Sequence, residues 1–367
     1  MSTTTRADVV VVGLGIHGSG AVSELARRGV NVVGIDRFGP GHGRGSSHGR
    51  TRMIRRAYPN PVWNALVDTA FAGWSELEQR SGQTLVHRTG GLYAHAGHSQ
   101  LQGEGCILIE DPAELSARMP GLRVPAGFSA VYDPSAGVIE AERAIAALQE
   151  EARAAGAQLC FDERMLGWDS TADGVEIVTE SGRILADRVV FTVGSWVAAT
   201  FPSFADLIEV WRILTLTVAA GQPAGMPPSL GALSIDRPEG LLFGIPDADG
   251  NGVKMGIDAR EIWDPETPVA PLSAAEIAHF QDLFAEYLPG LDATPVEAAA
   301  CLYTMTDDKR FIVGSMPGAP EVIVASACSG HGFKFGPAIG SALADLATGI
   351  ARPDLDFISV SRRSVSA

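Results

Sequence analysis

Apolar and polar positions follow a regular order over the first 36 residues. Val9 to Val12 form a continuous apolar run that is typical of a buried strand, and a glycine-rich turn follows it. The spacing then predicts an amphipathic helix over 18–28 and a second apolar strand over 30–35, which ends at Asp36. Strand, glycine turn, helix, strand and acid occur in the order of a dinucleotide-binding βαβ unit.

The glycine turn contains Gly13, Gly15 and Gly18 in the pattern G-x-G-x-x-G. Glycine at these positions permits a tight turn, close approach of the backbone to a pyrophosphate, and close packing of helix on strand. The helix N-terminus then presents unpaired N–H groups to the phosphates. Asp36 is placed to accept hydrogen bonds from a ribose diol. The pattern predicts dinucleotide binding, and a glycine turn without a ligand is the alternative.

The later pattern favours FAD over NAD as the dinucleotide. The segment 37–58 is rich in Gly, Ser, His and Arg, and it is too long and polar for a routine connection. A second helix with apolar positions at helical spacing comes only near residue 141, and alternating strands over 165–196 follow it. Glutathione-reductase-like flavoproteins return to their cofactor through a meander of this kind, whereas nicotinamide dehydrogenases continue directly with βα units.

We therefore expect an α/β protein with a glutathione-reductase-like FAD-binding Rossmann domain that is interrupted in sequence. The second domain is expected to be an α+β substrate domain with a mixed or antiparallel sheet. The expected FAD-binding domain comprises 1–88, 139–210 and 311–367, and the expected substrate domain comprises 89–138 and 211–310.

Composition agrees with two ordinary globular domains. The chain has 367 residues, of which 46% are hydrophobic and 19% charged, so it is long enough for two cores. The formal net charge of -15 opposes binding of nucleic acid, because a phosphate-binding face needs clustered Lys and Arg. No stretch approaches the roughly 18 apolar residues of a membrane span, and we expect no membrane association.

The four cysteines do not form a recognisable framework. They are widely separated and include no C-x-x-C pair, so neither a metal site nor a set of disulfides is indicated. Reduced thiols and a cytoplasmic location fit this pattern.

Four segments together resemble a known family. "GSSHGRTRMIRRAY", "NGVKMG", "ACLYTMTDDKRFIVG" and "SGHGFKFGPAIG" are similar to motifs of the monomeric sarcosine oxidase and N-methyltryptophan oxidase family, within the broader D-amino-acid-oxidase-like flavoproteins. The resemblance covers nearly the whole chain in the same order. It implies an FAD-dependent amine oxidase, and we expect it to be a monomer.

The resemblance implies which residues lie beside the flavin. His48 and Arg52 match positions against the ring, where a cation stabilises the negative charge gained on reduction. Lys254 is implied to turn inward from its strand and to reach flavin N5 through water, where a positive charge favours reaction with dioxygen. The motif at 329–335 brings its backbone close to the flavin through two glycines. Its expected cofactor-binding residues are Gly330, His331, Gly332, Phe333 and Lys334.

The resemblance also implies a clamp for a substrate carboxylate. Arg55 offers a planar pair of N–H donors and Lys334 a point charge, a combination suited to a carboxylate in a partly dry pocket. Arg56, by contrast, is expected to be a surface or structural charge.

Two residues of the expected substrate pocket depart from the sarcosine-oxidizing pattern. Phe243 stands in place of a tyrosine, and Asp258 in place of a histidine. Asp258 is either a salt-bridged acid at a strand end or a pocket residue. If it faces the pocket, the substrate is expected to carry a second cationic or hydroxyl group.

Cys301 has several possible roles. A buried structural cysteine is the commonest, and no second Cys or His stands at metal-ligand spacing. The resemblance implies that Cys301 holds FAD covalently, as a thioether to the 8α-methyl carbon. Attachment needs a thiolate, and we expect the cations His48, Arg52 and Lys254 to lower the pKa of this thiol.

The expected function is oxidation of a secondary or cyclic α-amino acid to an imine, with O2 reduced to H2O2 and with sarcosine as a poor substrate. An NAD(P)-linked dehydrogenase is an alternative, but it leaves Cys301, Lys254 and "SGHGFKF" without a role. A non-catalytic flavin-binding protein is the other.

Overall fold

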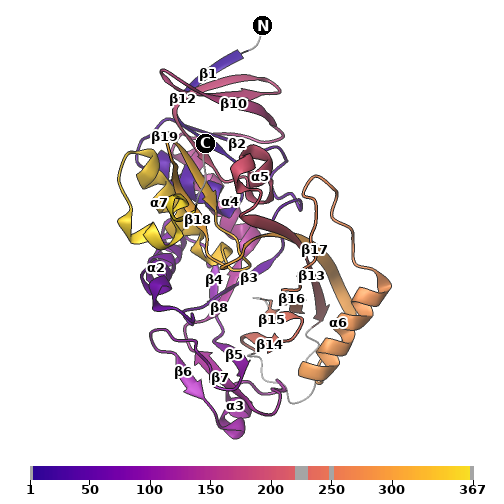
Figure 1. The fold of residues 1–367 in the computed structure, drawn as a ribbon. Coiled ribbons are helices and arrows are strands. Elements are labelled where there is room, and N and C mark those ends of the chain that lie inside the picture. The colour runs from indigo at the N-terminus through magenta and orange to yellow at the C-terminus, as the bar shows by residue number, and fades with distance from the viewer. Residues whose placement is uncertain (1–2, 220–229, 248–251, 364–367) are drawn as a thin grey trace.

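The computed structural model describes residues 3–219, 230–247 and 252–363 (Figure 1). Within these residues, two eight-stranded sheets and one three-stranded sheet carry the fold. The N-terminal sheet lies at the top of Figure 1 with α7 beside it, and the second sheet lies below with α6 against it. Asn251, part of the expected "NGVKMG" motif, is outside the described residues.

The first sheet contains the predicted dinucleotide unit. Its order is β10-β11-β12-β1-β2-β9, and β19 joins β12 and carries β18. The pairs among β9, β2, β1, β12 and β19 are parallel, while β10, β11 and β12 form the predicted antiparallel meander. The strands are β1 Thr3–Val12, β2 Val32–Ile35, β9 Gln158–Cys160, β10 Met165–Thr171, β11 Gly174–Thr179, β12 Gly182–Phe191, β18 Ile312–Met316 and β19 Ala319–Ser326.

The second sheet is mixed, as expected, and has the order β17-β13-β16-β15-β14-β5-β7-β6. Only the β14–β5 pair is parallel. The strands are β5 Gly91–Ala96, β6 Ile107–Ile109, β7 Phe128–Asp133, β13 Ile208–Ala219, β14 Ala232–Arg237, β15 Gly240–Pro246, β16 Gly252–Ile257 and β17 Pro295–Thr306.

A small antiparallel sheet, β3-β8-β4, completes the strands. It shows that the segment 37–58, expected as a loop, contains a strand at its end. The strands are β3 Thr51–Ile54, β4 Val86–Arg88 and β8 Gly137–Glu140. The α-helices are α1 Ile16–Arg27, α2 Asn64–Ser81, α3 Pro112–Arg118, α4 Ala141–Ala154, α5 Val197–Thr200, α6 Ala274–Tyr287 and α7 Gly336–Ala347, and the 3₁₀ helices are η1 Pro61–Trp63, η2 Gly194–Trp196, η3 Pro202–Phe204, η4 Phe333–Phe335, η5 Pro353–Ile358 and η6 Val360–Arg362.

The first helix and second strand differ from the predicted bounds by two residues each. Helix α1 begins at Ile16 rather than residue 18, because Gly15 already serves as its N-cap. Strand β2 begins at Val32 rather than residue 30, because the Val30 N–H donates to the Leu25 carbonyl in the turn that ends α1.

The sheets give the expected domain division a structural basis, and we keep it as a proposal. The second sheet takes its strands from 91–133 and 208–306, so the proposed boundary between 210 and 211 falls inside β13. Central strands of the first sheet are covered on one side by α1 and α7, whose apolar residues share a core with β1 and β19.

Gly18 is required by close packing inside the first βα turn. A Cβ at this position would lie 1.8 Å from the Gly13 carbonyl oxygen and 2.5 Å from Thr192 Oγ1. Neither neighbour is free to move, because Gly13 belongs to the turn and Thr192 Oγ1 donates to the same Gly13 oxygen at 2.6 Å.

We predict that Gly18→Ala lowers the free energy of unfolding by about 1–3 kcal/mol, the usual cost of overpacking. Chemical denaturation measures this loss. Gly167→Ala is the matched control, because a Cβ there meets nothing within 4 Å; its effect is expected within about 0.5 kcal/mol. Equal stability of the Gly18 variant and the parent would contradict the packing argument.

Candidate active site

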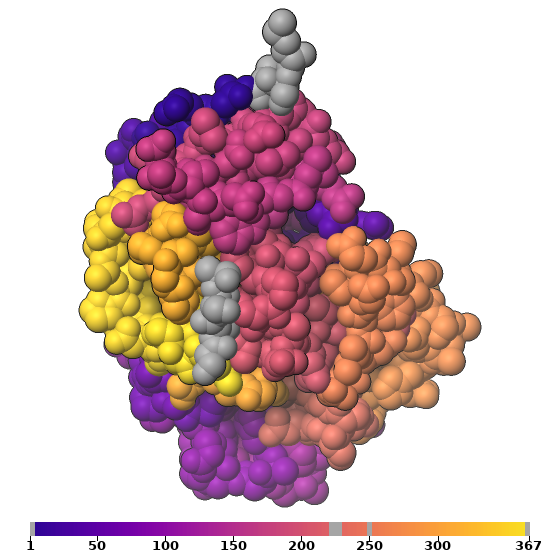
Figure 2. All heavy atoms as spheres, turned by 45° about the horizontal axis from the view of Figure 1, so that its top comes forward, coloured from indigo at the N-terminus to yellow at the C-terminus, as the bar shows by residue number. Residues whose placement is uncertain are grey.

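A cavity of about 1280 Å³ lies between the glycine turn of the first sheet and one face of the second sheet. Its lining also includes much of the segment 37–58 and the motif at 329–335. Figure 2 shows a hollow between the magenta and orange parts of the surface, with indigo atoms of the N-terminal region at its edge. The cavity thus joins segments that are far apart in sequence.

The second sheet has two chemically different faces. Side chains alternate between faces along each strand, so the sequence pattern of each strand divides between them. One face packs on α6, through residues such as Leu216, Leu233, Leu242, Met255 and Phe284. The other face lines the cavity and contributes Thr215, Thr217, Ser234, Asp236, Leu241, Phe243, Lys254, Ala299, Cys301 and Tyr303.

The predicted dinucleotide residues meet at one end of the cavity. Gly13 and Gly15 line it, and Gly13 has a φ of +95° that favours glycine. Asp36 lines it too, but its carboxylate accepts the Leu14 N–H at 2.7 Å and the Phe38 N–H at 2.9 Å. Asp36 therefore also ties the end of β2 to the glycine turn, a structural role that the sequence did not indicate. Each of its oxygens keeps a further acceptor site.

These residues fit FAD. A Cβ on Gly13 would lie 2.6 Å from the Thr192 carbonyl oxygen, so only glycine permits the tight turn that a dinucleotide needs at this position. Gly15, the N-cap of α1, offers no side-chain cap. The Ile16 N–H donates to the Ser47 hydroxyl at 3.2 Å, and the other N–H groups of the first turn can bind a pyrophosphate. The cavity exceeds the roughly 300–1,000 Å³ of an ordinary small-molecule pocket, so it has room for a dinucleotide and a substrate.

Three of the expected flavin-side residues come together in the cavity wall. Lys254 donates through Nζ to the Thr51 carbonyl at 2.7 Å, and Arg52 donates to the carbonyls of Ser46 and His48. Burial, and next the Arg52 charge, lower the pKa of Lys254 to about 7. The ammonium and amine forms of Lys254 are therefore both populated near neutral pH.

The expectation of positive charge on His48 needs correction. Burial, followed by the charge of Arg52, lowers the pKa of His48 to about 4, so the imidazole is neutral at pH 7. Its Nε2 is buried without a hydrogen-bond partner among the described residues. Arg52, rather than His48, supplies the positive charge at this position.

Cys301 lines the cavity from β17, opposite Ile213 of β13. The expected cations Arg52 and Lys254 do act to lower the pKa of this thiol, but a larger opposite effect outweighs them. Burial raises the pKa of this thiol to about 11, and the charges of Arg52 and Lys254 only partly offset that effect. Cys328 also lines the cavity and raises the pKa of Cys301 further.

The structure brings Arg55 and Lys334 to one aromatic ring. The guanidinium carbon of Arg55 lies 4.7 Å from the ring centre of Tyr58 and 5.1 Å from that of Tyr93. Lys334 Nζ lies 5.6 Å from the Tyr58 ring centre and donates to the Tyr58 hydroxyl at 3.1 Å. Burial, and next the charge of Arg55, lower the pKa of Lys334 well below its usual value.

A directional chain of hydrogen bonds fixes Lys334. The Lys309 carbonyl can only accept, so His331 donates to it through Nε2 at 2.9 Å. His331 Nδ1 is then the acceptor for the Tyr58 hydroxyl at 3.1 Å. Lys334 Nζ donates to the Tyr58 oxygen and to the His331 carbonyl at 2.8 Å, which leaves one of its three N–H groups for a ligand. Burial lowers the pKa of His331 and keeps it neutral, as this arrangement requires.

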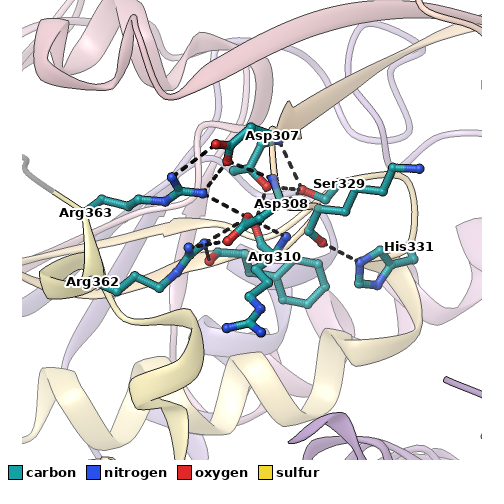
Figure 3. Close-up of polar contacts among 10 residues, drawn as sticks. Asp307, Asp308, Arg310, Ser329, His331, Arg362 and Arg363 are labelled. Atoms are coloured by element: carbon teal, nitrogen blue, oxygen red, sulfur yellow. Dashed lines mark hydrogen bonds and ion pairs between the residues drawn. The ribbon is translucent and has the colours of Figure 1, made fainter. Parts of the chain in front are cut away.

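The turn that holds His331 is anchored by the C-terminal segment (Figure 3). Arg362 Nη1 pairs with Asp308 at 2.6 Å, and Arg363 pairs with Asp307 and, at 3.0 Å, with Asp308. Lys309 lies next in this turn and has a φ of +56°. Two adjacent arginines thus hold the backbone whose carbonyl sets the tautomer of His331.

The two glycines of the motif at 329–335 are each required for a different structural reason. Gly330 has a φ of +77°, and a Cβ on Gly332 would lie 1.7 Å from the Ala327 carbonyl oxygen. The Gly332 carbonyl contacts His17 Nε2 at 3.3 Å, which joins this motif to α1. Phe333 stacks near Trp74 with ring centres 6.3 Å apart.

Asp258 and Phe243 both line the cavity. Asp258 Oδ1 is buried with no hydrogen-bond partner among the described residues, so the salt-bridged alternative is not what the structure shows. Burial raises the pKa of Asp258 to about 7, and the charges of Lys309, Arg55 and Lys334 oppose that rise. Arg56 is absent from the cavity lining and instead lies 4.4 Å from the Phe71 ring centre and pairs with Asp68.

Sequence reasoning missed several cavity residues. Tyr58 lies inside a motif that the resemblance used, but no role was assigned to it. His95, Ser234, Asp236 and Tyr303 were not selected either. Alternation of polar and apolar residues within β14 and β17 was the available signal, but it does not tell which face meets a cavity.

The described parts of the chain contain neither a cluster of metal ligands nor a membrane-spanning helix. No group of three or more His, Cys, Asp or Glu residues there could hold a metal ion. No helix there is long and apolar enough to cross a membrane.

The fold and the cavity define a flavin-dependent oxidoreductase. A protein-family model described as "FAD dependent oxidoreductase", DAO, matches residues 8–346. The chain belongs to this family, and it is an FAD-dependent amino acid or amine oxidase. The predicted family and the predicted α/β fold class with a mixed second sheet are confirmed, and the residue bounds of the two domains stay a proposal.

Named relatives and solved structures agree with this assignment. Monomeric sarcosine oxidase of Bacillus sp. (strain B-0618) is 30% identical over 98% of this chain and 97% of its own. N-methyl-L-tryptophan oxidase of Yersinia pestis (strain Pestoides F) is 28% identical over 97% and 99%. The open form of a variant of NikD, titled an unusual amino acid oxidase essential for nikkomycin biosynthesis, has a TM-score of 0.85 and 25% identity, with 97% of each chain covered.

Proposed function

We propose that this protein oxidises a secondary or cyclic α-amino acid at its C–N bond, releases an imine, and reduces O2 to H2O2. The proposal further holds that sarcosine itself is a poor substrate. The observation that carries it is the meeting of Arg55 and Lys334 on Tyr58 inside a cavity that also fits FAD.

Two adjacent cations in a partly dry pocket favour an anionic ligand. Arg55 and Lys334 repel each other, which contributes to the lowered pKa of Lys334. A substrate carboxylate between them supplies the missing negative charge, and it can accept from the forked guanidinium and from the free N–H of Lys334. The carboxylate thus orients the α-carbon and amine within the cavity.

FAD, when bound, supplies the acceptor for the hydride equivalent from substrate and passes the electrons on to O2. Gly13, Gly15 and Asp36 would hold its dinucleotide part. Arg52 and Lys254 provide positive charge in the same cavity wall, and the Lys254 ammonium is held by the Thr51 carbonyl. Such fixed charge stabilises developing negative charge in a water-poor site.

The substrate is expected to be larger than sarcosine. Phe243 replaces a hydroxyl-bearing ring with an apolar one, and Asp258 adds an unpartnered carboxyl to the cavity wall. A group that donates a hydrogen bond to Asp258 would satisfy this buried oxygen. An amine, a hydroxyl or a second cationic group on the substrate meets that requirement.

Peroxide release tests the proposal across N-methyl, cyclic and sugar-conjugated α-amino acids. We expect turnover of at least one such compound, with kcat/KM for sarcosine at least about tenfold lower, since losing one polar contact typically costs about 1–3 kcal/mol. No peroxide from any compound would refute the proposed reaction. Sarcosine as the best substrate would refute the specificity.

We predict that Arg55→Ala or Lys334→Ala weakens binding of carboxylate substrates and of simple carboxylate inhibitors. Removing one arm of a buried charged pair costs about 2–5 kcal/mol. Titration of the flavin spectrum with an unreactive carboxylate measures this change. Arg56→Ala is the matched control, because Arg56 is the adjacent arginine but lies outside the cavity lining. Equal affinity in the Arg55 and Arg56 variants would contradict the clamp.

We predict that Lys254→Met is still reduced by substrate without oxygen but is reoxidised at least about tenfold more slowly, because methionine keeps much of the apolar stem but removes the charge, together with the hydrogen bond to the Thr51 carbonyl. Stopped-flow mixing with O2 measures the rate. In the parent, reoxidation should slow as pH rises through about 7, where Lys254 loses its proton. This dependence of the reoxidation rate on pH should be absent from the variant. If it persists, another titrating group is responsible for it.

We also propose that Cys301 carries FAD through a covalent thioether. Its place in the cavity wall supports this. Burial raises the pKa of the thiol, and the charges of Arg52 and Lys254 partly offset that rise in favour of the thiolate. The resemblance of "AACLYTMTDDKRFIVG" to the family segment supports the same residue.

We predict that acid-precipitated parent protein stays yellow and that its intact mass exceeds the chain mass by one FAD. Cys301→Ser should release the flavin on denaturation. Cys328→Ser is the matched control, since Cys328 is the neighbouring thiol in the same cavity, and it should keep the bound flavin. Release from both variants, or a colourless parent precipitate, would exclude attachment through Cys301.

A further inference from the structure

Cavity-facing side chains of the second sheet form rows across its strands (β14, β15 and β16 in Figure 1). One row across the strands contains Tyr93, Ser234, Phe243 and Gly256, as the pairing of β5, β14, β15 and β16 shows; of these, Ser234 and Phe243 line the cavity. The next row lies two positions away on each strand, forward on β5, β14 and β16 and backward on the antiparallel β15. Across β5, β14, β15 and β16, this second row contains His95, Asp236, Leu241 and Asp258 in that order. Asp236 and Leu241 are a directly paired position.

The first row lies beneath the proposed carboxylate clamp. The Arg55 guanidinium is 5.1 Å from the Tyr93 ring centre. His95 follows Tyr93 by two residues on the same strand, so the two side chains are about 7 Å apart along it. That separation matches the length of an extended amino acid side chain whose carboxylate is held by Arg55.

His95 and Asp236 form a pair that offers acceptors. His95 Nδ1 and Asp236 Oδ2 are 2.7 Å apart, and the carboxylate accepts, so in the neutral imidazole Nδ1 carries the hydrogen and Nε2 is an acceptor. Nε2 has no hydrogen-bond partner among the described residues. Asp236 is 49% exposed, which places the pair at the open end of the cavity.

Ser234 provides a third polar group beside this pair. It is only 4% exposed, and it lines the cavity. A hydroxyl can both donate and accept, so it suits a polar ligand group at this position. Ser234 stands opposite Phe243 on the neighbouring strand, so an apolar ring separates this polar end from Lys254 and the cofactor side.

We propose that Ser234, His95 and Asp236 form a second substrate subsite, which binds a hydrogen-bond donor, a hydroxyl or an ammonium group, at the far end of the substrate side chain. This inference rests on the proposed oxidation of an α-amino acid. Leu241 and Phe243 contact the apolar middle of that side chain. The substrate class is therefore an N-alkylated or cyclic α-amino acid with a polar, donor-bearing tail.

Matched substrate pairs test the subsite. α-N-methyl-L-tyrosine is compared with α-N-methyl-L-phenylalanine, and α-N-methyl-L-lysine with α-N-methyl-L-norleucine. In at least one pair the donor-bearing compound should have a kcat/KM about tenfold or more above its partner. A response of the tyrosine pair alone identifies a hydroxyl, and one of the lysine pair alone an ammonium group. Equal values within both pairs would overturn the proposal.

Variants locate the preference. Ser234→Ala and Asp236→Asn should each reduce the ratio of kcat/KM between the two compounds of the responding pair to about threefold or less. Because both compounds are measured on the same variant, a general loss of activity does not change this ratio. Asp282→Asn is the control, because Asp282 is an exposed acid on α6, which covers the opposite face of the sheet. A ratio that survives in both subsite variants would place the preference elsewhere and overturn the proposal.

Binding without turnover separates this inference from the proposed reaction. Calorimetry compares 3-(4-hydroxyphenyl)propionate with 3-phenylpropionate, and 6-aminohexanoate with hexanoate, on the flavin-loaded protein and on Asp236→Asn. A preference for the donor-bearing carboxylate that is lost in the variant supports the subsite even if no amino acid is oxidised. Oxidation without any preference, in binding or turnover, overturns the subsite and leaves the proposed function standing.

Discussion

The two faces of the second sheet are the constraint on which the site depends. Side chains alternate strictly along a strand, so a strand that gives apolar residues to α6 must present its other residues to the opposite side. Met255 packs in the core under α6 while its neighbour Lys254 lines the cavity. A shift in register by one residue would turn the Lys254 ammonium into the apolar core and the Met255 thioether toward the cavity, so the core and the active site stabilise the same register.

The charged side chains of the cavity are incompletely paired with one another. Arg55 and Lys334 repel each other, and the charge of Asp258 only partly offsets the lowering of the Lys334 pKa. Asp258 Oδ1 has no hydrogen-bond partner among the described residues. An α-amino acid carries both a carboxylate and a group that donates, so one ligand can satisfy all three residues. Burial shifts the pKa of Lys334 down and that of Asp258 up, so the charged form of each side chain is unfavourable in this buried position, and a ligand with complementary groups can remove that cost.

The long segment after the first βαβ unit connects the two halves of the site. Its Ser47 hydroxyl accepts the Ile16 N–H at the start of α1, and its Thr51 carbonyl holds Lys254 of the second sheet. Tyr58, at its end, receives Lys334 from the C-terminal part of the chain. A connection that looks irregular in sequence is therefore fixed by contacts to every part of the cavity, which explains its length.

The sequence by itself determined the βαβ unit and the α/β fold class, because strand and helix periods and the G-x-G-x-x-G pattern are local properties of the chain, and the resemblance of four segments indicated the family. It did not determine the charge of His48 or the pKa of Cys301, since both depend on burial by distant segments. Only the tertiary structure decided that Asp258 faces the cavity and that His95 and Asp236 pair. Strand alternation assigns residues to two faces, but only packing against α6 decides which face remains open.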